Sequence, residues 1–129
     1  MYNFNGKNIP VKVTVATETE PTVVDGVYSA TADGFILEFS IGTDKFTVAH
    51  GADKTTVRAA GLMTYDITLC DDTTNTVLAT PFGMVNFAVK TELRRVENSE
   101  DGIHVMLCYV LSADGVGDMA RSVDITIKN

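Results

Sequence analysis

The 129-residue chain is long enough for one domain with a hydrophobic core, and its 45% hydrophobic and 21% charged residues exclude general disorder. Seventeen Asp and Glu against ten Lys and Arg give a net charge of −7, which repels phosphate backbones and argues against a nucleic-acid partner. The polar start MYNFNGKNIP predicts no signal peptide, and no apolar run approaches the roughly 18 residues of a membrane-spanning helix. We therefore expect a single domain over 1–129, a cytoplasmic location and no membrane partner.

Apolar and polar residues alternate with period two along the first half of the chain, and no segment keeps a helical period. The first predicted strand covers 9–17 and carries its valines on one face. The Asp-Gly pairs at 25–26 and 33–34 are typical turn sequences, so we expect them to bracket a short strand over 27–32. Further strands are predicted over 34–41, 45–50, 54–60 and 62–69.

The second half continues in the same way. The polar segment 71–75 predicts a turn, and turns are also expected at 98–102 and 112–115. The predicted strands are a short one before Pro81 and longer ones over 84–96, 103–111 and 116–128. Regular short turns without intervening helices favour an antiparallel sheet, either closed into a barrel or folded as a sandwich. Because closure removes exposed edges, we predict an all-β closed barrel of about 8–10 strands.

Several short motifs follow one another in a recognisable order. They are Thr-Thr-Val-Arg at 55–58, a Met/aromatic strand, Thr-Pro-Phe-Gly at 80–83, Val-Lys-Thr at 89–91, a strand with Tyr109 and Leu111, and Ile-Thr-Ile at 125–127. The ordered set resembles the YwiB-like family of small bacterial β-barrel proteins of unknown function. This resemblance implies a calycin-like, lipocalin-type barrel and supplies no activity. The chain departs from the family at Leu78, where a Tyr is usual, and at Cys70-Asp71, where a Gly-containing turn is usual.

No combination of residues predicts catalysis. His50 and His104 are the only histidines, and no His-x-His or Cys-x-x-Cys pattern is present, so neither a metal nor another cofactor is expected. On a strand, His104 and Cys108 would lie about 13 Å apart, too far for a nucleophile and its base. Cys70 and Cys108 are expected to be free thiols. These patterns favour a protein that is not an enzyme, and a minimal enzyme site formed by Arg58 with Tyr65 or Tyr109 is the alternative that we rank last.

Two segments of the second half, 80–83 and 94–95, predict local structure and no chemistry. Thr-Pro-Phe-Gly at 80–83 is expected to break strand pairing at a barrel corner, because proline cannot donate to a strand ladder and glycine permits a bulge. This places Phe82 at the rim of the barrel. Arg94 and Arg95, between Glu92 and Glu97, predict a solvated strand end.

Aromatic side chains on the presumed inner face predict a site for a small apolar or amphipathic molecule in the barrel or at its mouth. The pattern leaves open the alternative that these side chains simply fill the barrel. Arg58 would need an anionic partner inside the barrel, whereas at the rim it would face solvent. The candidate ligand-binding residues are Phe39, Phe46, Arg58, Tyr65, Phe82, Phe87 and Tyr109.

The predicted strand over 103–111 is apolar on both faces, unlike a barrel strand with one solvent-exposed side. Its outer face therefore indicates a second function, an interaction module that forms a homodimer or acts as a regulatory subunit. The competing interpretation is that the N-terminal segment 1–6 covers this face. The candidate interface residues are Met84, His104, Met106, Cys108 and Val110.

Overall fold

The computed structural model describes residues 6–17 and 20–129, and these form strands with no helix among them. The ten strands are β1 (Ile9–Ala16), β2 (Thr22–Ala30), β3 (Phe35–Ile41), β4 (Asp44–His50), β5 (Thr55–Ala60), β6 (Tyr65–Leu69), β7 (Thr74–Thr80), β8 (Gly83–Ser99), β9 (Gly102–Ala113) and β10 (Gly117–Lys128). The short turns predicted around 33–34 and 98–102 are both present, as the strand ends show. The all-β prediction is thus confirmed.

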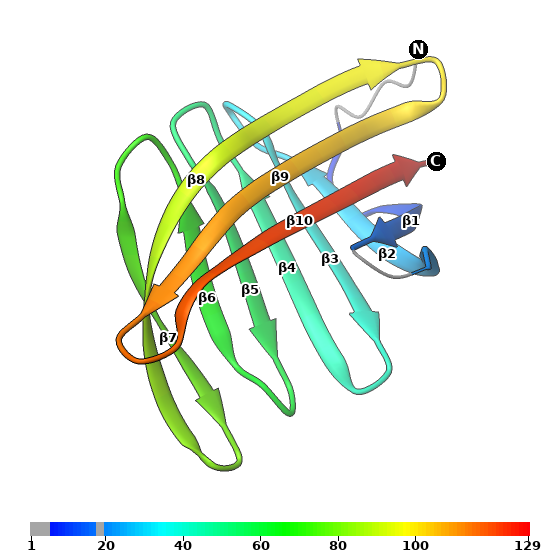
Figure 1. The fold of residues 1–129 in the computed structure, drawn as a ribbon. Helices are drawn as coiled ribbons and strands as arrows, with labels where there is room; N and C mark the ends of the chain where they lie inside the picture. The colour runs from blue at the N-terminus through cyan, green and yellow to red at the C-terminus, as the bar shows by residue number, and fades with distance from the viewer. Residues whose placement is uncertain (1–5, 18–19) are drawn as a thin grey trace.

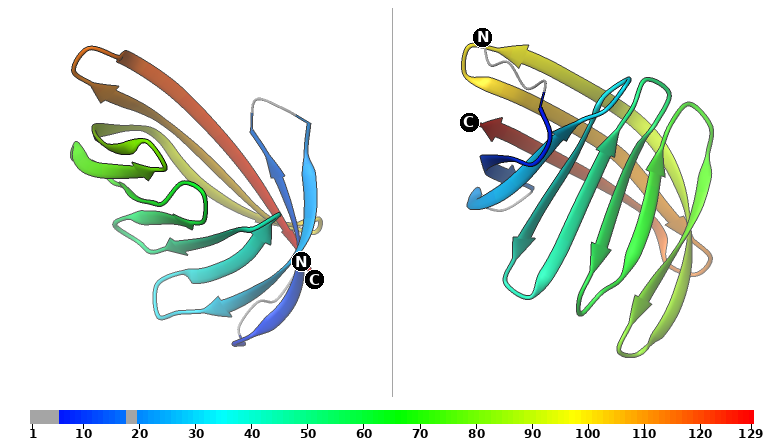
Figure 2. Two further views of the ribbon diagram at one scale, coloured as in Figure 1. Left: turned by 90° about the horizontal axis from the view of Figure 1, so that it is seen from below. Right: turned by 180° about the vertical axis from the view of Figure 1, so that it is seen from behind.

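All ten strands belong to one antiparallel sheet, in the order β6-β5-β4-β3-β2-β1-β10-β9-β8-β7. Strands that follow one another in the chain pair with each other, except β6 with β7, and β1 also pairs with β10 through Lys12–Ala16 and Asp124–Lys128. The sheet curls so that β8, β9 and β10 cross in front of β3 to β6 (Figure 1), and the two further views show the same curvature (Figure 2). The result is a nearly closed barrel, as predicted.

The barrel wall has a seam where β6 and β7 meet without a regular ladder. One backbone bridge joins Thr64 to Ala79, with N–H to O distances of 3.0 and 2.9 Å. The hydroxyl of Thr76 donates to the Asp66 carbonyl at 2.6 Å, and Thr74 makes an equivalent bond to β6 at 2.7 Å. Threonine hydroxyls thus bond to carbonyls that an adjacent strand would otherwise satisfy. We call this junction the β6–β7 seam.

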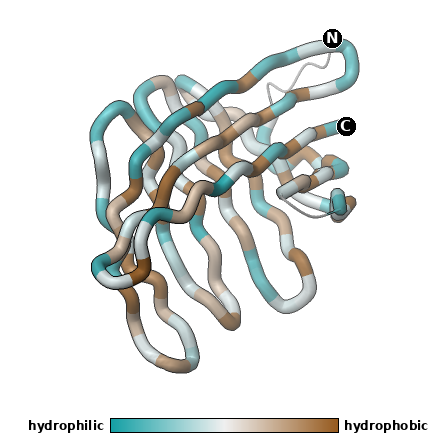
Figure 3. The backbone as a smooth tube through the Cα atoms, in the orientation of Figure 1, coloured by the Kyte–Doolittle hydropathy of each residue, from teal (hydrophilic) through white to brown (hydrophobic). Residues whose placement is uncertain are grey.

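The core lies inside the barrel because hydrophobic and hydrophilic residues alternate along the strands (Figure 3), which sends apolar side chains inward. Burial alternates regularly on β9, where every second side chain from Ile103 to Tyr109 is buried. The buried apolar residues are Val11, Val13, Tyr28, Phe35, Leu37, Phe39, Val48, Ala59, Ile67, Leu69, Phe87, Val89, Ile103, Val105, Leu107, Tyr109, Ile125 and Ile127.

The predicted turn at 25–26 is wrong, because both residues lie inside β2. Gly26 sits at a close approach between strands: a Cβ atom there would lie 2.7 Å from Val13 Cγ2 and 2.9 Å from the Glu38 carbonyl oxygen. Glycine inside a strand pattern therefore marks tight packing at this position and does not mark a turn.

The predicted break in pairing at 80–83 is also wrong. β7 and β8 pair as far as Thr80 opposite Gly83, so Pro81 and Phe82 form the turn of a tight hairpin. Gly83 has a φ of +131°, in a region that glycine adopts most easily. The Thr80 hydroxyl donates to the Gly83 carbonyl at 2.9 Å and accepts the Phe82 N–H at 3.2 Å, which braces the turn.

Strand β8 contains a bulge at Glu92, where its register with β9 shifts between Thr91 and Leu93. Before the bulge, the odd-numbered side chains Phe87 and Val89 face the core. After it, even-numbered Arg94 lies opposite Leu107, an inward-facing residue of β9. A single extra residue thus turns the following side chains to the other face of the strand.

Gly26→Ala should destabilise the protein by about 1–3 kcal/mol, the usual cost of overpacking, because the new methyl group meets Val13 and a backbone oxygen. Urea unfolding measures this change. Asp25→Ala is the matched control, since Asp25 is an exposed neighbour whose ion pair with Lys12 contributes little. Equal unfolding midpoints for wild type and Gly26→Ala would show that the strands move apart at no cost.

Candidate functional site

A cavity of about 390 Å³ lies inside the barrel behind the β6–β7 seam. Its wall is built mainly from β6, β7, β8, β9 and β10, with Thr17 just after β1 and Met63 just before β6. The lining residues are Thr17, Met63, Tyr65, Ile67, Thr76, Leu78, Phe87, Tyr109, Leu111, Arg121, Ser122 and Val123. Aliphatic and aromatic side chains form most of the wall, and a few polar groups project from it.

The polar groups reach the cavity because they occupy inward positions of their strands. Tyr109 on β9 lies directly opposite Arg121 on β10, so the phenol and the guanidinium are cross-strand neighbours. Tyr65 on β6 lines the same cavity from the other wall. Thr76, also in the wall, is engaged with the Asp66 carbonyl across the seam. One part of the cavity thus combines two phenols with a guanidinium.

Both tyrosines remain protonated at neutral pH. Burial, and then the neighbouring Tyr65, raise the pKa of Tyr109 to about 12, although Arg121 acts in the opposite direction. Burial, and then the Asp44 carboxylate, raise the pKa of Tyr65, and Arg121 again opposes the shift. A neutral phenol is a hydrogen-bond donor, so the cavity offers two O–H groups beside the Arg121 N–H groups.

The cavity opens where the barrel wall lacks a strand. β1 ends opposite Asp124, so residues 117–123 of β10 pair with β9 alone. Arg121 lies on this half of β10 and is exposed, although it also lines the cavity. Met63, on the rim across from it, is 50% exposed. The guanidinium is therefore placed at the mouth, with apolar wall behind it.

Three of the seven candidate ligand-binding residues, Tyr65, Phe87 and Tyr109, come together in this cavity. Phe39 and Phe46 do not line it. Their rings stack on each other with centroids 5.4 Å apart, and Phe39 is buried in the core. These two aromatics thus fill another part of the barrel, as the alternative interpretation of the inner face proposed.

The other two candidates lie outside the barrel. Arg58 is exposed and forms an ion pair with Asp66, at 2.9 Å between Nη2 and Oδ2, so an interior position for this residue is wrong. Phe82 is 100% exposed at the tip of the β7–β8 hairpin and does not plug the barrel end. Arg58 is exposed because it occupies an outward position of its strand. Phe82 is exposed because its segment forms a tight hairpin and not a barrel corner.

Arg94 has a structural role that the sequence pattern did not reveal. Its guanidinium donates to the carbonyls of Gly51 and Ala52 at 2.9 and 2.8 Å and to the Thr55 hydroxyl at 3.2 Å. Thr55 is fully buried, and its hydroxyl also contacts His50 Nδ1 at 2.8 Å. Arg94 therefore fastens β8 to the β4–β5 turn across the barrel, and its prediction as part of a solvated strand end is wrong.

The Arg94 contacts affect the neighbouring histidine. Burial, and then the positive charge of Arg94, lower the pKa of His50, while Asp33 acts in the opposite direction.

The inward position of Arg94 could have been predicted from the apolar residues of β8. The apolar residues Phe87 and Val89 have odd numbers, whereas the apolar residue Val96 has an even number. This change in the alternation indicates a bulge between them.

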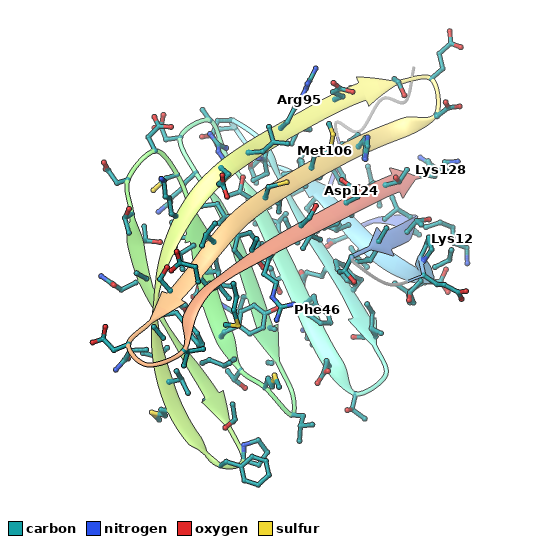
Figure 4. All side chains as sticks on the ribbon, in the orientation of Figure 1. Lys12, Phe46, Arg95, Met106, Asp124 and Lys128 are labelled. Carbon is teal, nitrogen blue, oxygen red and sulfur yellow. The ribbon has the colours of Figure 1, made fainter. Side chains whose placement is uncertain are left out.

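The outer face of β9 carries a narrow apolar stripe. His104, Met106, Cys108 and Val110 are each partly buried there, and Met106 lies between Arg95 of β8 and Asp124 of β10 in the register. Figure 4 shows these three labelled side chains on the three crossing strands. Polar neighbours therefore border the stripe, and His104 Nε2 lies 3.8 Å from Asp124 Oδ1.

The remaining interface candidate, Met84, is 77% exposed on the β7–β8 hairpin, beyond the first residue of β8 that pairs with β9. The structure thus separates it from the β9 stripe. Residues 1–5 of the segment proposed to cover that stripe lie outside the described residues. Within the described ranges, no three His, Cys, Asp or Glu side chains gather in a way that could hold a metal ion. Cys70 and Cys108 are free thiols, as expected.

Replacing Arg94 by Met should destabilise the fold by about 1.5–3 kcal/mol, because carbonyls of the β4–β5 turn lose a charged donor. Chemical unfolding provides the measurement. Arg95→Met is the matched control, since Arg95 pairs with Glu97 on the exposed side of the same strand and should change stability little. If both variants lost the same stability, the hydrogen bonds of Arg94 to the β4–β5 turn would contribute no more to the free energy of unfolding than the exposed Arg95 pair does.

The comparisons with known proteins concern the fold. The crystal structure of the ywiB protein from Bacillus subtilis is similar to this chain, with a TM-score of 0.66 over 93% of this chain and 88% of that one. The sequence identity is 16%, so this likeness establishes a YwiB-like fold and nothing about activity. No protein-family model matches the chain, and no curated protein matches it either. The resemblance found in the sequence motifs is confirmed at the level of the fold.

Proposed function

We propose that this protein binds a small amphipathic molecule in the barrel cavity. The observation that carries the proposal is the cavity itself, which at about 390 Å³ falls within the usual range of ligand pockets, roughly 300–1,000 Å³. Its wall is mainly apolar and has a few convergent polar groups, the arrangement that orients a ligand and gives specificity.

We also propose the cytoplasmic location predicted from the sequence. The described residues include no helix long and apolar enough to span a membrane.

The wall supplies the driving force for binding. Ile67 and Phe87 are buried, while Leu78 and Leu111 are partly buried around the same space. Each methylene group of a ligand transferred from water to such a wall contributes about 0.8 kcal/mol. An alkyl chain of moderate length can therefore offset the entropy lost on association. The polar end of such a ligand would lie at the mouth, where it contacts the polar groups of the protein and water.

Filling the cavity should abolish binding. Leu111→Trp places a larger side chain in the wall, so the affinity for decanol measured by isothermal titration calorimetry should fall at least about tenfold. Leu93→Trp is the matched control because Leu93 is 40% exposed opposite Cys108 on the outer face. Circular dichroism establishes that both variants fold. Unchanged decanol binding by Leu111→Trp would reject the proposal, and so would a wild type that binds neither decanol nor its charged analogues decanoate and decylammonium.

The second candidate function is a homodimer or regulatory subunit formed through the outer face of β9. It is favoured by the three consecutive outward positions Met106, Cys108 and Val110, which carry no charge on the wall of an otherwise alternating barrel. The charged neighbours on β8 and β10 restrict such an interface to a narrow strip. For this reason we rank it below ligand binding.

Light scattering tests this second candidate. A dimer built on the stripe should dissociate in Met106→Asp, because a buried unpaired carboxylate at the interface is costly. The control is Val23→Asp, since Val23 is 61% exposed on β2, a strand distant from β9 in the sheet order. A wild-type monomer, or a dimer that withstands Met106→Asp, would exclude this interface.

A further inference from the structure

We infer that the cavity selects a ligand with an anionic head group, a carboxylate on an apolar chain, and that Arg121 with Tyr65 and Tyr109 binds this group. The inference rests on the proposed function and adds the chemical class of the ligand. Its basis is the presence of one guanidinium and two phenols, from three strands and within electrostatic reach of one another, in the wall of a mainly apolar space.

Arg121 is suited to hold a carboxylate. Its guanidinium presents five N–H donors in a planar fork that can bind both oxygens of a carboxylate at once. The fork has enough donors to bind an anion while keeping a further contact within the protein. Because Arg121 lies on the part of β10 without a β1 partner, it meets both the cavity and solvent. A charged head group placed there keeps part of its hydration.

Tyr65 and Tyr109 complete the site from β6 and β9. Burial is the main cause of the raised pKa of each phenol, so each hydroxyl keeps its proton at neutral pH. The charge of Arg121 acts on both tyrosines, which places the guanidinium within electrostatic reach of both rings. Two neutral O–H donors beside a cation form charge-assisted hydrogen bonds to an anion, whereas a hydrocarbon gains nothing from them and an ammonium group is repelled by the Arg121 charge.

The position of the polar end also sets the direction of the ligand. Ile67 and Phe87 are almost completely buried, and both line the cavity. The exposed parts of the lining are Thr17, Met63, Arg121 and Ser122. An amphipathic molecule therefore places its chain against the buried wall and its head group at the mouth, where donors replace the water it loses.

Two features oppose an anion. The protein has a net charge of −7, and the Asp44 carboxylate lies close enough to Tyr65 to raise its pKa. Asp44 does not line the cavity, however, and one of its oxygens accepts the Leu62 N–H at 3.1 Å. Its charge is therefore partly compensated, while the guanidinium of Arg121 belongs to the wall itself. An ammonium head group is the alternative that Asp44 would favour.

The experiment compares three probes with the same chain, decanoate, decanol and decylammonium, by isothermal titration calorimetry on the full-length protein at pH 7.5. Wild type should bind decanoate about tenfold or more tightly than decanol or decylammonium, because hydrogen bonds from a charged donor are among the strongest. Arg121→Gln should remove this preference, because decanoate loses its charged donor. Tyr109→Phe should reduce it in part. Arg95→Gln, on the outer face, should bind as wild type does.

The outcomes separate the two proposals. If none of the three probes binds, the cavity does not take amphipathic ligands, and the proposed function fails together with this inference. If decanol binds as tightly as decanoate, or Arg121→Gln leaves the preference intact, the head-group assignment is overturned while the binding function stands. Tighter binding of decylammonium would likewise overturn it and would assign the selection to Asp44.

Discussion

The pairing of β1 with β10 is the constraint on which the rest of the structure depends. Every other ladder joins strands that are neighbours in the chain, and such hairpins alone would form an open, twisted sheet. The contact between Lys12–Ala16 and Asp124–Lys128 brings the two ends of the meander together and encloses a core. Because β1 stops at Ala16 while β10 continues to Gly117, the same pairing leaves one part of the wall incomplete. The closure of the barrel and the mouth of its cavity thus have one cause.

The two ends of the interior are finished differently. At the β4–β5 turn, Arg94 reaches across from β8 and satisfies backbone carbonyls, so a charged side chain serves as part of the barrel closure. At the cavity mouth, Arg121 stands in the wall beside Tyr109. The two arginines lie on β8 and β10, the strands on either side of β9, and the second lines the cavity whereas the first does not. Identical side-chain chemistry therefore performs a structural task at one end and, we propose, a binding task at the other.

Much of the fold could be predicted from the sequence because period-two alternation directly reports which face of a strand is buried. That signal predicted the strands and their inward aromatics, including Tyr65, Phe87 and Tyr109. It failed where one residue changes the geometry: Gly26 reads as a turn but serves close packing, and the bulge at Glu92 reverses the facing of Arg94. The position and size of the cavity could not be predicted, because they depend on which inward side chains fail to meet across the barrel, and alternation contains no information on that.

The β6–β7 seam gives the barrel wall an uneven resistance to local opening. Elsewhere two strands separate only by breaking a full ladder, whereas here the junction consists of one backbone bridge and threonine hydroxyl bonds. Local unfolding begins where the fewest backbone hydrogen bonds must break, so the free energy of opening is lowest along this line. Thr76 takes part in the seam and also lines the cavity. The fold thus places its most easily opened boundary next to the cavity, so we expect opening at this seam to change the volume of the cavity before any regular ladder breaks.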